Sequence, residues 1–170
     1  MRKQFIIFIT ILTLPFVHVA AQQDPVSAFL EKWENSKNYL LQIAEAMPED
    51  KYKYKPSERQ MTFAKQLDHI QQNMNWLGST YFSAPKPETS TSSNRKEQML
   101  ANIKSAFNTV YNAVKGTSDK ELKETVDFFA GPKTKLQILN LLQDHVTHHR
   151  GQLIVYLNLN EIAPPRYVGW

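Results

Sequence analysis

Apolar side chains recur every three or four residues in four long stretches of the sequence, which is the spacing that places them on one face of an α-helix. These stretches are predicted to be helices over residues 24–47, 62–81, 94–116 and 134–157. Their buried faces are predicted to carry Phe29, Trp33, either Leu40 or Leu41, Ala44, Phe63, Leu67, Ile70, Met74, Leu77, Met99, Ile103, Phe107, Val110, Val114, Ile138, Leu142, Val146 and Leu153. No alternating pattern long enough for a β-strand accompanies them, so the sequence indicates an all-α fold.

Each predicted helix begins at a residue whose side chain can accept a hydrogen bond from the free backbone N–H groups of the first turn. The four N-cap residues are Asp24, Thr62, Asn94 and Thr134. A glutamate or glutamine follows three residues after Asn94 and Thr134, which gives both positions the spacing of a capping box. Gly116 is expected to end the third helix, because glycine is favoured directly after a helix C-terminus.

The connections between the predicted helices differ in length and composition. Residues 51–59 carry Tyr52 and Tyr54 without a helical row of apolar side chains. We interpret them as a loop that covers one end of the helices; a substrate-binding loop is the alternative. Residues 83–93 are rich in proline, serine and threonine and are predicted to be a long flexible connection inside one domain. Four amphipathic helices joined in this way predict an antiparallel four-helix bundle.

The N-terminal segment has the three parts of a secretory signal peptide. Arg2 and Lys3 precede an almost wholly apolar run over residues 5–19, and small residues lie before a polar stretch. The apolar run is shorter than the roughly 20 residues that span a bilayer, which favours cleavage over the alternative of a retained membrane anchor. We therefore expect a signal peptide at 1–21 and one domain at 22–170. The mature protein would be exported, either periplasmic or secreted, without a stable membrane anchor.

The charge of the sequence narrows the range of binding partners. The formal net charge of the sequence is +4, and loss of the two basic residues of the signal peptide would lower it by two. This small excess, without an evident cluster of Lys and Arg, argues against a nucleic acid partner, because phosphate binding needs several basic side chains together.

The sequence contains no cysteine. The stability of an exported domain of this kind must therefore come from its core or from a bound metal rather than from disulfides.

The last predicted helix contains three histidines within five residues, at His145, His148 and His149. Residues four apart lie on the same face of a helix, so the imidazoles of His145 and His149 can point at one atom. His148 could instead pair with His145, at a spacing of three. We prefer His149 because it continues the inward-facing row that includes Leu142 and His145. The metalloprotease signature places a glutamate directly after its first histidine, and this sequence has valine there.

His69 is the candidate third ligand. It lies one step off the core row of the second predicted helix, and it would face His145 and His149 if the two helices are neighbours. Neutral imidazoles suit Zn, Ni, Cu or Fe better than Mg or Ca, which prefer oxygen ligands. Asp144 or Gln152 could accept a hydrogen bond from a ligand imidazole. The alternative is that the histidines are packed side chains without a metal.

Three segments of the sequence together resemble the DinB/YfiT-like family of metal-dependent enzymes. They are residues 61–70 around the single histidine of the second helix, residues 144–153 with the pattern H-x-x-x-H-x-G-Q, and the proline-containing tail at 162–165. The resemblance covers nearly the whole chain after the signal peptide. It implies a four-helix bundle with a bound divalent metal, nickel or zinc. The ligand triad of the family falls on His69, His145 and His149.

The resemblance also implies a chemistry. Family members with known activity transfer or isomerise groups with low-molecular-weight thiols such as bacillithiol or mycothiol. We therefore expect a metal-dependent thiol S-transferase or hydrolase in which the metal activates a bound thiol or water. The expected partners are a small-molecule substrate, such as a thiol, and a second copy of the chain in a homodimer. The alternative is a non-enzymatic, exported metal-binding or stress-response module.

Overall fold

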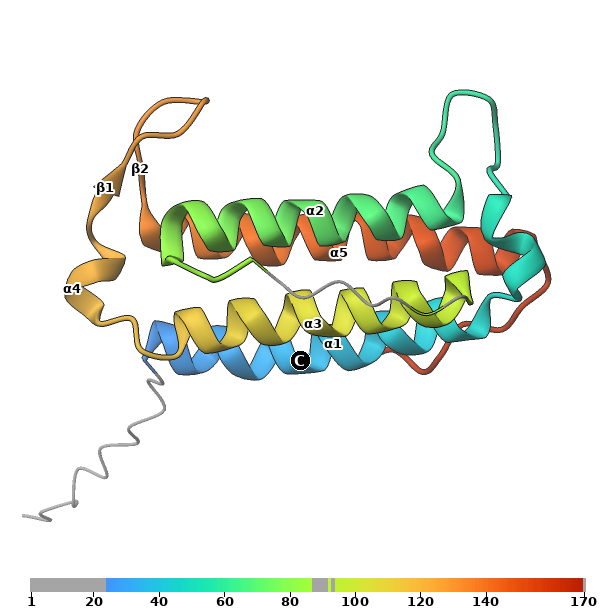
Figure 1. Ribbon diagram of the computed structural model, residues 1–170, viewed down its shortest axis with the longest axis horizontal. Helices are drawn as coiled ribbons and strands as arrows, with labels where there is room; N and C mark the ends of the chain where they lie inside the picture. The colour runs from blue at the N-terminus through green and yellow to red at the C-terminus, as the bar shows by residue number, and fades with distance from the viewer. Residues whose placement is uncertain (1–23, 87–91, 93, 170) are drawn as a thin grey trace, which may run out of the picture.

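The structure of the chain, a computed structural model, describes residues 24–86, 92 and 94–169. Its elements in chain order are α1 (Pro25–Ala46), the 3₁₀ helix η1 (Glu49–Lys53), α2 (Phe63–Phe82), α3 (Arg95–Val114), α4 (Asp119–Leu122), β1 (Thr125–Val126), β2 (Lys133–Thr134) and α5 (Lys135–Leu159). These residues are mostly helical, as the sequence predicts (Figure 1). The predicted signal peptide at 1–21 lies outside the described residues. None of the described helices has the length and apolar character needed to cross a membrane.

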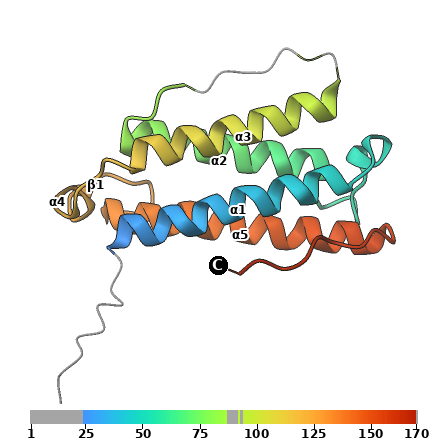
Figure 2. The same ribbon diagram turned by 90° about the horizontal axis from the view of Figure 1, so that it is seen from below.

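The four long helices lie side by side (Figures 1 and 2). α2 packs against α3 and α5, and α1 packs against the same two helices. α1 and α5 run in one direction and α2 and α3 run in the other (Figure 1). The antiparallel order predicted from the sequence therefore holds for the pairs α1/α3 and α2/α5, whereas α1/α5 and α2/α3 are parallel. A long connection such as the one predicted at 83–93 permits a parallel pair, because the chain must cross the length of the helices between them.

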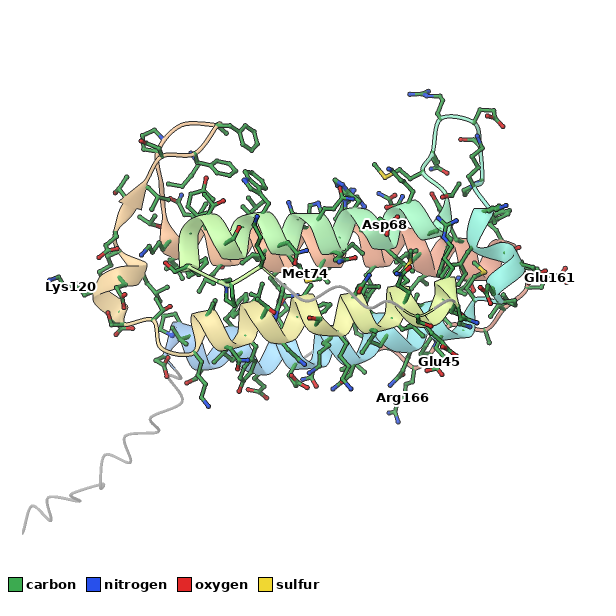
Figure 3. All side chains as sticks on the ribbon, viewed as in Figure 1. Glu45, Asp68, Met74, Lys120, Glu161 and Arg166 are labelled. Atoms are coloured by element: carbon green, nitrogen blue, oxygen red, sulfur yellow. The ribbon has the colours of Figure 1, made fainter. Side chains whose placement is uncertain are left out.

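The core lies between the long helices and contains the rows of apolar side chains that the sequence predicts. Met74 of α2 is fully buried and lies between α2 and α3 (Figure 3). Trp33 of α1 is also fully buried, and its ring contacts those of Phe29 and Phe107. The indole nitrogen of Trp33 donates a hydrogen bond of 3.0 Å to the carbonyl oxygen of Phe107, which joins α1 to α3. The predicted core residues are buried, and of the two alternatives in α1 Leu40 is buried whereas Leu41 is only partly buried. The pattern of the sequence therefore identifies the inner face of each long helix.

All four predicted N-cap side chains accept a backbone hydrogen bond at the start of their helix. Thr134 and Gln137 form a complete capping box: the backbone N–H of Gln137 donates to the threonine hydroxyl, and the backbone N–H of Thr134 donates to the glutamine side chain. This box fixes the start of α5, the helix with three histidines. At the end of α3 the C-cap is Lys115 rather than the predicted Gly116. Gly116 does not adopt the positive φ that makes glycine necessary at many helix ends.

Two short segments differ from the sequence prediction. η1 overlaps the start of the region 51–59 that the sequence predicts to be a loop. Tyr52 is buried there, and its hydroxyl donates a hydrogen bond of 2.8 Å to the carbonyl oxygen of Ala44. β1 and β2 pair antiparallel, with Thr125 opposite Thr134, and form a small hairpin before α5. Strands of two residues are too short to show alternation, which is why the hydrophobic pattern does not reveal them.

Candidate metal centre

The three predicted ligand histidines lie together at the seam between α2 and α5. His69 comes from α2, and His145 and His149 come from successive turns of α5. Because the two helices are antiparallel, His69 meets His145, while Gln66, one turn earlier on α2, meets His149. The ligand nitrogens of the three histidines lie within 4.8 Å of one another. Their ring centroids are between 4.5 and 4.8 Å apart, so the three imidazoles form one cluster.

The closest pair of ring nitrogens has a separation suited to a shared metal. Nε2 of His145 and Nε2 of His69 are 3.1 Å apart. Two nitrogens bound to one tetrahedral zinc at 2.0–2.1 Å are separated by about 3.3 Å. Neutral nitrogen donors also match the preference of zinc, nickel and copper over magnesium and calcium. The three close histidines could therefore hold a metal ion, and a set of three protein ligands leaves a coordination position for water or substrate.

Burial keeps two of the histidines in the neutral form that binds metals. His149 is buried, whereas His145 and His69 are half-buried. Burial, followed by the neighbouring histidines, lowers the pKa of His145 to about 4. Burial and the nearby His69 and His148 lower the pKa of His149 to about 4. Both imidazoles are therefore neutral at neutral pH, so a metal does not have to compete with an imidazolium proton.

A glutamine of α2 orients one of the imidazoles. Gln66 is 2% exposed, and its Oε1 lies 2.6 Å from Nδ1 of His149. The amide nitrogen of Gln66 faces Oε1 of Gln152 and the hydroxyl of Tyr156, which leaves the amide oxygen for His149. His149 therefore donates its Nδ1 proton to Gln66, and the lone pair of its Nε2 is available to a metal. This arrangement is the one that metal-binding histidines usually have.

The hydroxyl of Tyr156 extends this network to the main chain. It donates a hydrogen bond of 2.9 Å to the carbonyl oxygen of Met61 and lies 3.3 Å from the amide nitrogen of Gln66. Met61 immediately precedes Thr62, the N-cap of α2. The network thus ties the later turns of α5 to the start of α2, and it holds Gln66 beside the histidine cluster.

The residue that accepts a hydrogen bond from a ligand imidazole is Gln66, and not Asp144 or Gln152 as the sequence suggests. Asp144 is exposed, and in the described part of the chain its carboxylate makes no hydrogen bond to the three histidines. Gln152 accepts a hydrogen bond from the side chain of Gln66 and does not contact a ligand histidine. Gln66 lies three residues before His69 and therefore on the same face of α2, but this spacing does not indicate its contact with His149 on α5.

His148 lies outside the cluster. It is exposed, and its ring meets that of His149 edge-on at a centroid distance of 4.8 Å. Its Nε2 accepts a hydrogen bond of 2.8 Å from the amide nitrogen of Gln152. The geometry therefore groups His149, and not His148, with His69 and His145.

The fold and the histidine cluster together define a helical protein with a site able to hold a metal ion. The DinB family matches residues 21–166, and the chain belongs to this family. Two solved structures are similar to it. The DinB-like protein YjoA from Bacillus subtilis shares 20% sequence identity, with a TM-score of 0.69 over 82% of this chain and 96% of that chain. A DinB-like protein from Bacillus cereus ATCC 10987 shares 18% identity, with a TM-score of 0.70 over 84% of this chain and 97% of that chain.

The comparisons confirm the family resemblance that three segments of the sequence carry. At identities this low, the similarity to the two solved structures demonstrates a shared fold and leaves the activity to be argued from the site. No curated protein matches the chain.

Proposed function

We propose that this protein is an exported metalloprotein that binds a divalent metal ion, zinc or nickel, through His69, His145 and His149. The observation that carries the proposal is the convergence of three imidazoles from two helices, with their ligand nitrogens within 4.8 Å of one another. The hydrogen bond between His149 and Gln66 supports it, because a ligand histidine commonly donates its other ring nitrogen to such an acceptor. Membership of the DinB family, whose members are associated with metals, agrees with this assignment.

The scaffold that we propose for the site is a four-helix bundle, a fold in which side chains of facing helices hold metals. The ligands come from α2 and α5, which are an antiparallel pair (Figure 1). Leu67 and Ile70 on α2, and Leu142 and Val146 on α5, are buried beside the histidines. Their packing fixes the register of the two helices, and the ligands are therefore positioned before any metal binds.

We further propose that the reaction is a thiol S-transfer or a hydrolysis of a small molecule. A divalent metal, when bound, would lower the pKa of a thiol or water and so supply a nucleophile. The chain itself keeps the imidazoles neutral and oriented. His69 and His145 are only half-buried, so a small molecule can approach the cluster from outside the core. Cleavage of the signal peptide at 1–21 and assembly as a homodimer belong to the same proposal.

Metal analysis of the purified protein tests the site. His69→Ala, His145→Ala and His149→Ala are each expected to lose stoichiometric metal, because two imidazoles hold a divalent ion far more weakly than three. His148→Ala is the matched control, since it removes a neighbouring histidine that lies outside the cluster, and it should retain the metal. Unchanged metal content in the first three variants would rule out the site.

A turnover screen separates an enzyme from a binding protein. The metal-loaded protein is expected to accelerate the reaction of a low-molecular-weight thiol with an electrophile, or the hydrolysis of an ester, and His145→Ala should abolish the acceleration. Stoichiometric metal without turnover of either kind would favour the alternative, a non-enzymatic exported metal-binding or stress-response module. Fractionation and N-terminal sequencing of the full-length product test export, which predicts a mature chain beginning near Gln22.

A further inference from the structure

Two rows of side chains lead from the histidine cluster to the same phenylalanine. On α2, Trp76 lies seven residues after His69 and therefore about 20° from it around the helix axis. On α5, Leu141 lies four residues before His145, about 40° around the axis and about 6 Å along it. Phe128, from the loop between β1 and β2, contacts the first row by stacking on Trp76 at a centroid distance of 6.0 Å. It reaches the second row by lining a pocket together with Leu141.

This pocket, between Phe128 and α5, has a volume of about 300 Å³. Its walls are mainly apolar and include Ile138 and Leu141, and Asp144 is the lining residue nearest in the sequence to the histidines of α5. Asp144 directly precedes His145, so the pocket ends within one helical turn of a ligand. A small, mainly apolar pocket with a few polar groups is typical of a site for a small molecule. The three histidines do not line the pocket, but its closeness to His145 along α5 indicates which molecule would use it.

We propose that this pocket binds a neutral, planar aromatic group of the small molecule that reacts at the histidine cluster. The inference rests on the proposed function, because it takes the cluster as the reacting centre. The bound ring would lie against Phe128 and Leu141, and the reacting atom of the same molecule would reach the open side of the three imidazoles. Phe128 is then a specificity-determining residue that touches neither the metal ligands nor Gln66.

Phe128 lines the pocket and is stacked from outside it by Trp76, and this ring favours a planar group over an aliphatic one. The rings of Phe128 and Trp76 are nearly parallel, with an interplanar angle of 25°, and Trp76 is 42% exposed. Aromatic rings gain additional energy from offset stacking with another ring, which an aliphatic group does not supply. The volume of about 300 Å³ also suits a group of one or two rings rather than a long chain.

The charged side chains of the pocket favour a neutral group. Lys133 lines the pocket, and its ammonium donates to the carbonyl oxygens of Ala130, Gly131 and Pro132 at 3.2–3.3 Å, which holds one positive charge there. The carboxylate of Asp144 is exposed at the other end and would repel an anion. Lys133 and Asp144 carry opposite charges, so a charged ring of either sign would lie near one like charge, whereas a neutral ring would not.

Titration of the metal-free protein with indole, a neutral planar compound of two fused rings, tests the pocket by NMR. We expect the backbone signals of Phe128, Leu141 and Asp144 and the indole N–H signal of Trp76 to shift together and to saturate. Cyclohexanol, which is apolar but not planar, should bind about fivefold more weakly, because it cannot stack. Equal affinities for the two probes, or shifts confined to other residues, would overturn the proposal.

Two neighbouring phenylalanines supply a matched pair of variants. Phe128→Ala should weaken indole binding about tenfold, which corresponds to the loss of an aromatic contact. Phe129→Ala removes the next ring in the sequence, which is 84% exposed and does not line the pocket. Because this ring packs on Phe128 at a centroid distance of 4.3 Å, its loss should weaken binding, but by clearly less than the loss of Phe128. Both variants change a surface loop, and a well-dispersed spectrum verifies that each is folded. Equal effects of the two substitutions would contradict the assignment of Phe128.

A paramagnetic ion tests the connection to the histidine cluster. With cobalt(II) loaded, the relaxation of the bound indole protons should be enhanced, and His145→Ala should remove the enhancement. Bound cobalt without enhancement would show that the pocket is separate from the reacting centre and would overturn the inference alone. Failure of cobalt to bind would overturn the proposed function, and with it the proposal that the pocket serves a reaction at the histidine cluster. The metal-free titration would still show whether the pocket binds an aromatic ring.

Discussion

Nδ1 of His149 lies 2.6 Å from Oε1 of Gln66, and this contact joins the two helices that form the histidine cluster. Both residues are buried, with exposed fractions of 8% and 2%. A buried hydrogen bond of this kind fixes both the orientation and the tautomer of the imidazole, because the alternative tautomer would leave two lone pairs facing each other. The metal affinity of the site should therefore depend on a residue that does not itself bind the metal.

Gln66→Ala is expected to weaken metal binding by about 10- to 100-fold, the usual effect of removing the hydrogen-bond partner of a ligand histidine. The substitution leaves all three ligands in place but frees the imidazole of His149 to rotate. Competition against a chromophoric chelator measures the change in affinity. Gln143→Ala is the matched control, since Gln143 is also a buried glutamine, but it bonds to Ser36 at the seam with α1. Equal losses in the two variants would contradict a specific role for Gln66.

The free energy of unfolding of the metal-free protein is expected to decrease as the pH falls from about 6.5 to about 4. The unfolded chain takes up protons at the ordinary histidine pKa of 6.5, whereas burial holds the pKa of His145 and His149 at about 4 in the folded protein. The unfolded state therefore binds more protons in this interval and is favoured by acid. Above pH 6.5 both histidines are neutral in both states and add no pH dependence. Urea unfolding in the presence of a chelator, at a series of pH values, measures the effect.

The double variant His145→Gln, His149→Gln is the comparison for this pH dependence, because carboxylates also titrate toward the lower end of the interval. Its stability should change less steeply between pH 6.5 and 4 than that of the wild type. Parallel curves for the two proteins over this interval would show that the histidines do not contribute.

Trp33→Ala is expected to lower the free energy of unfolding by about 3–5 kcal/mol, the range for removing a large aromatic side chain from a core. Trp33 is fully buried, and the substitution also leaves the carbonyl oxygen of Phe107 without its indole partner. Trp76→Ala removes the same type of side chain from a position that is 42% exposed, and it should cost about 1 kcal/mol or less. Urea unfolding followed by circular dichroism measures both; similar losses would mean that the core is not where the structure places it.

The inner faces of the helices could be predicted from the sequence because each turn of a buried face carries an apolar residue, which recurs every three or four positions. The row from Phe63 to Leu77 is buried throughout, and Thr62 caps its helix as expected. Such a row identifies the buried face of a helix but not the direction of the helix beside it. The parallel pair α2/α3 therefore could not be read from the apolar pattern, and the length of the connection at 83–93 was the one signal for it.

The same distinction applies to the histidine cluster. His145 and His149 could be paired from the sequence because a single helix sets their relative positions. His69 could be added only on the condition that α2 and α5 are neighbours, which the structure fulfils. Gln66 was missed as a hydrogen-bond partner because its contact with His149 spans 83 residues and depends on the register between two helices and on a side-chain rotamer. No local pattern in the sequence encodes either.

Removal of the metal is expected to lower the stability of the wild-type protein, because an ion that binds only the folded state favours that state. At a free metal concentration 100 times the dissociation constant, the expected stabilisation is about 2.7 kcal/mol. Unfolding in buffered zinc and in a chelator measures it. His148→Ala should respond to zinc as the wild type does, whereas the triple variant of His69, His145 and His149 should not respond.

The position of the ligands also predicts where this stabilisation acts. A metal held by His69 and His145 would link α2 to α5, so zinc should slow amide hydrogen exchange in these two helices more than in α1 and α3. An increase in protection spread evenly over the four helices would show that the ion acts only on global unfolding and not on local opening of α2 and α5. Equal unfolding free energies with zinc and with chelator would contradict the metal site itself, because no ion bound to the folded state alone can leave that quantity unchanged.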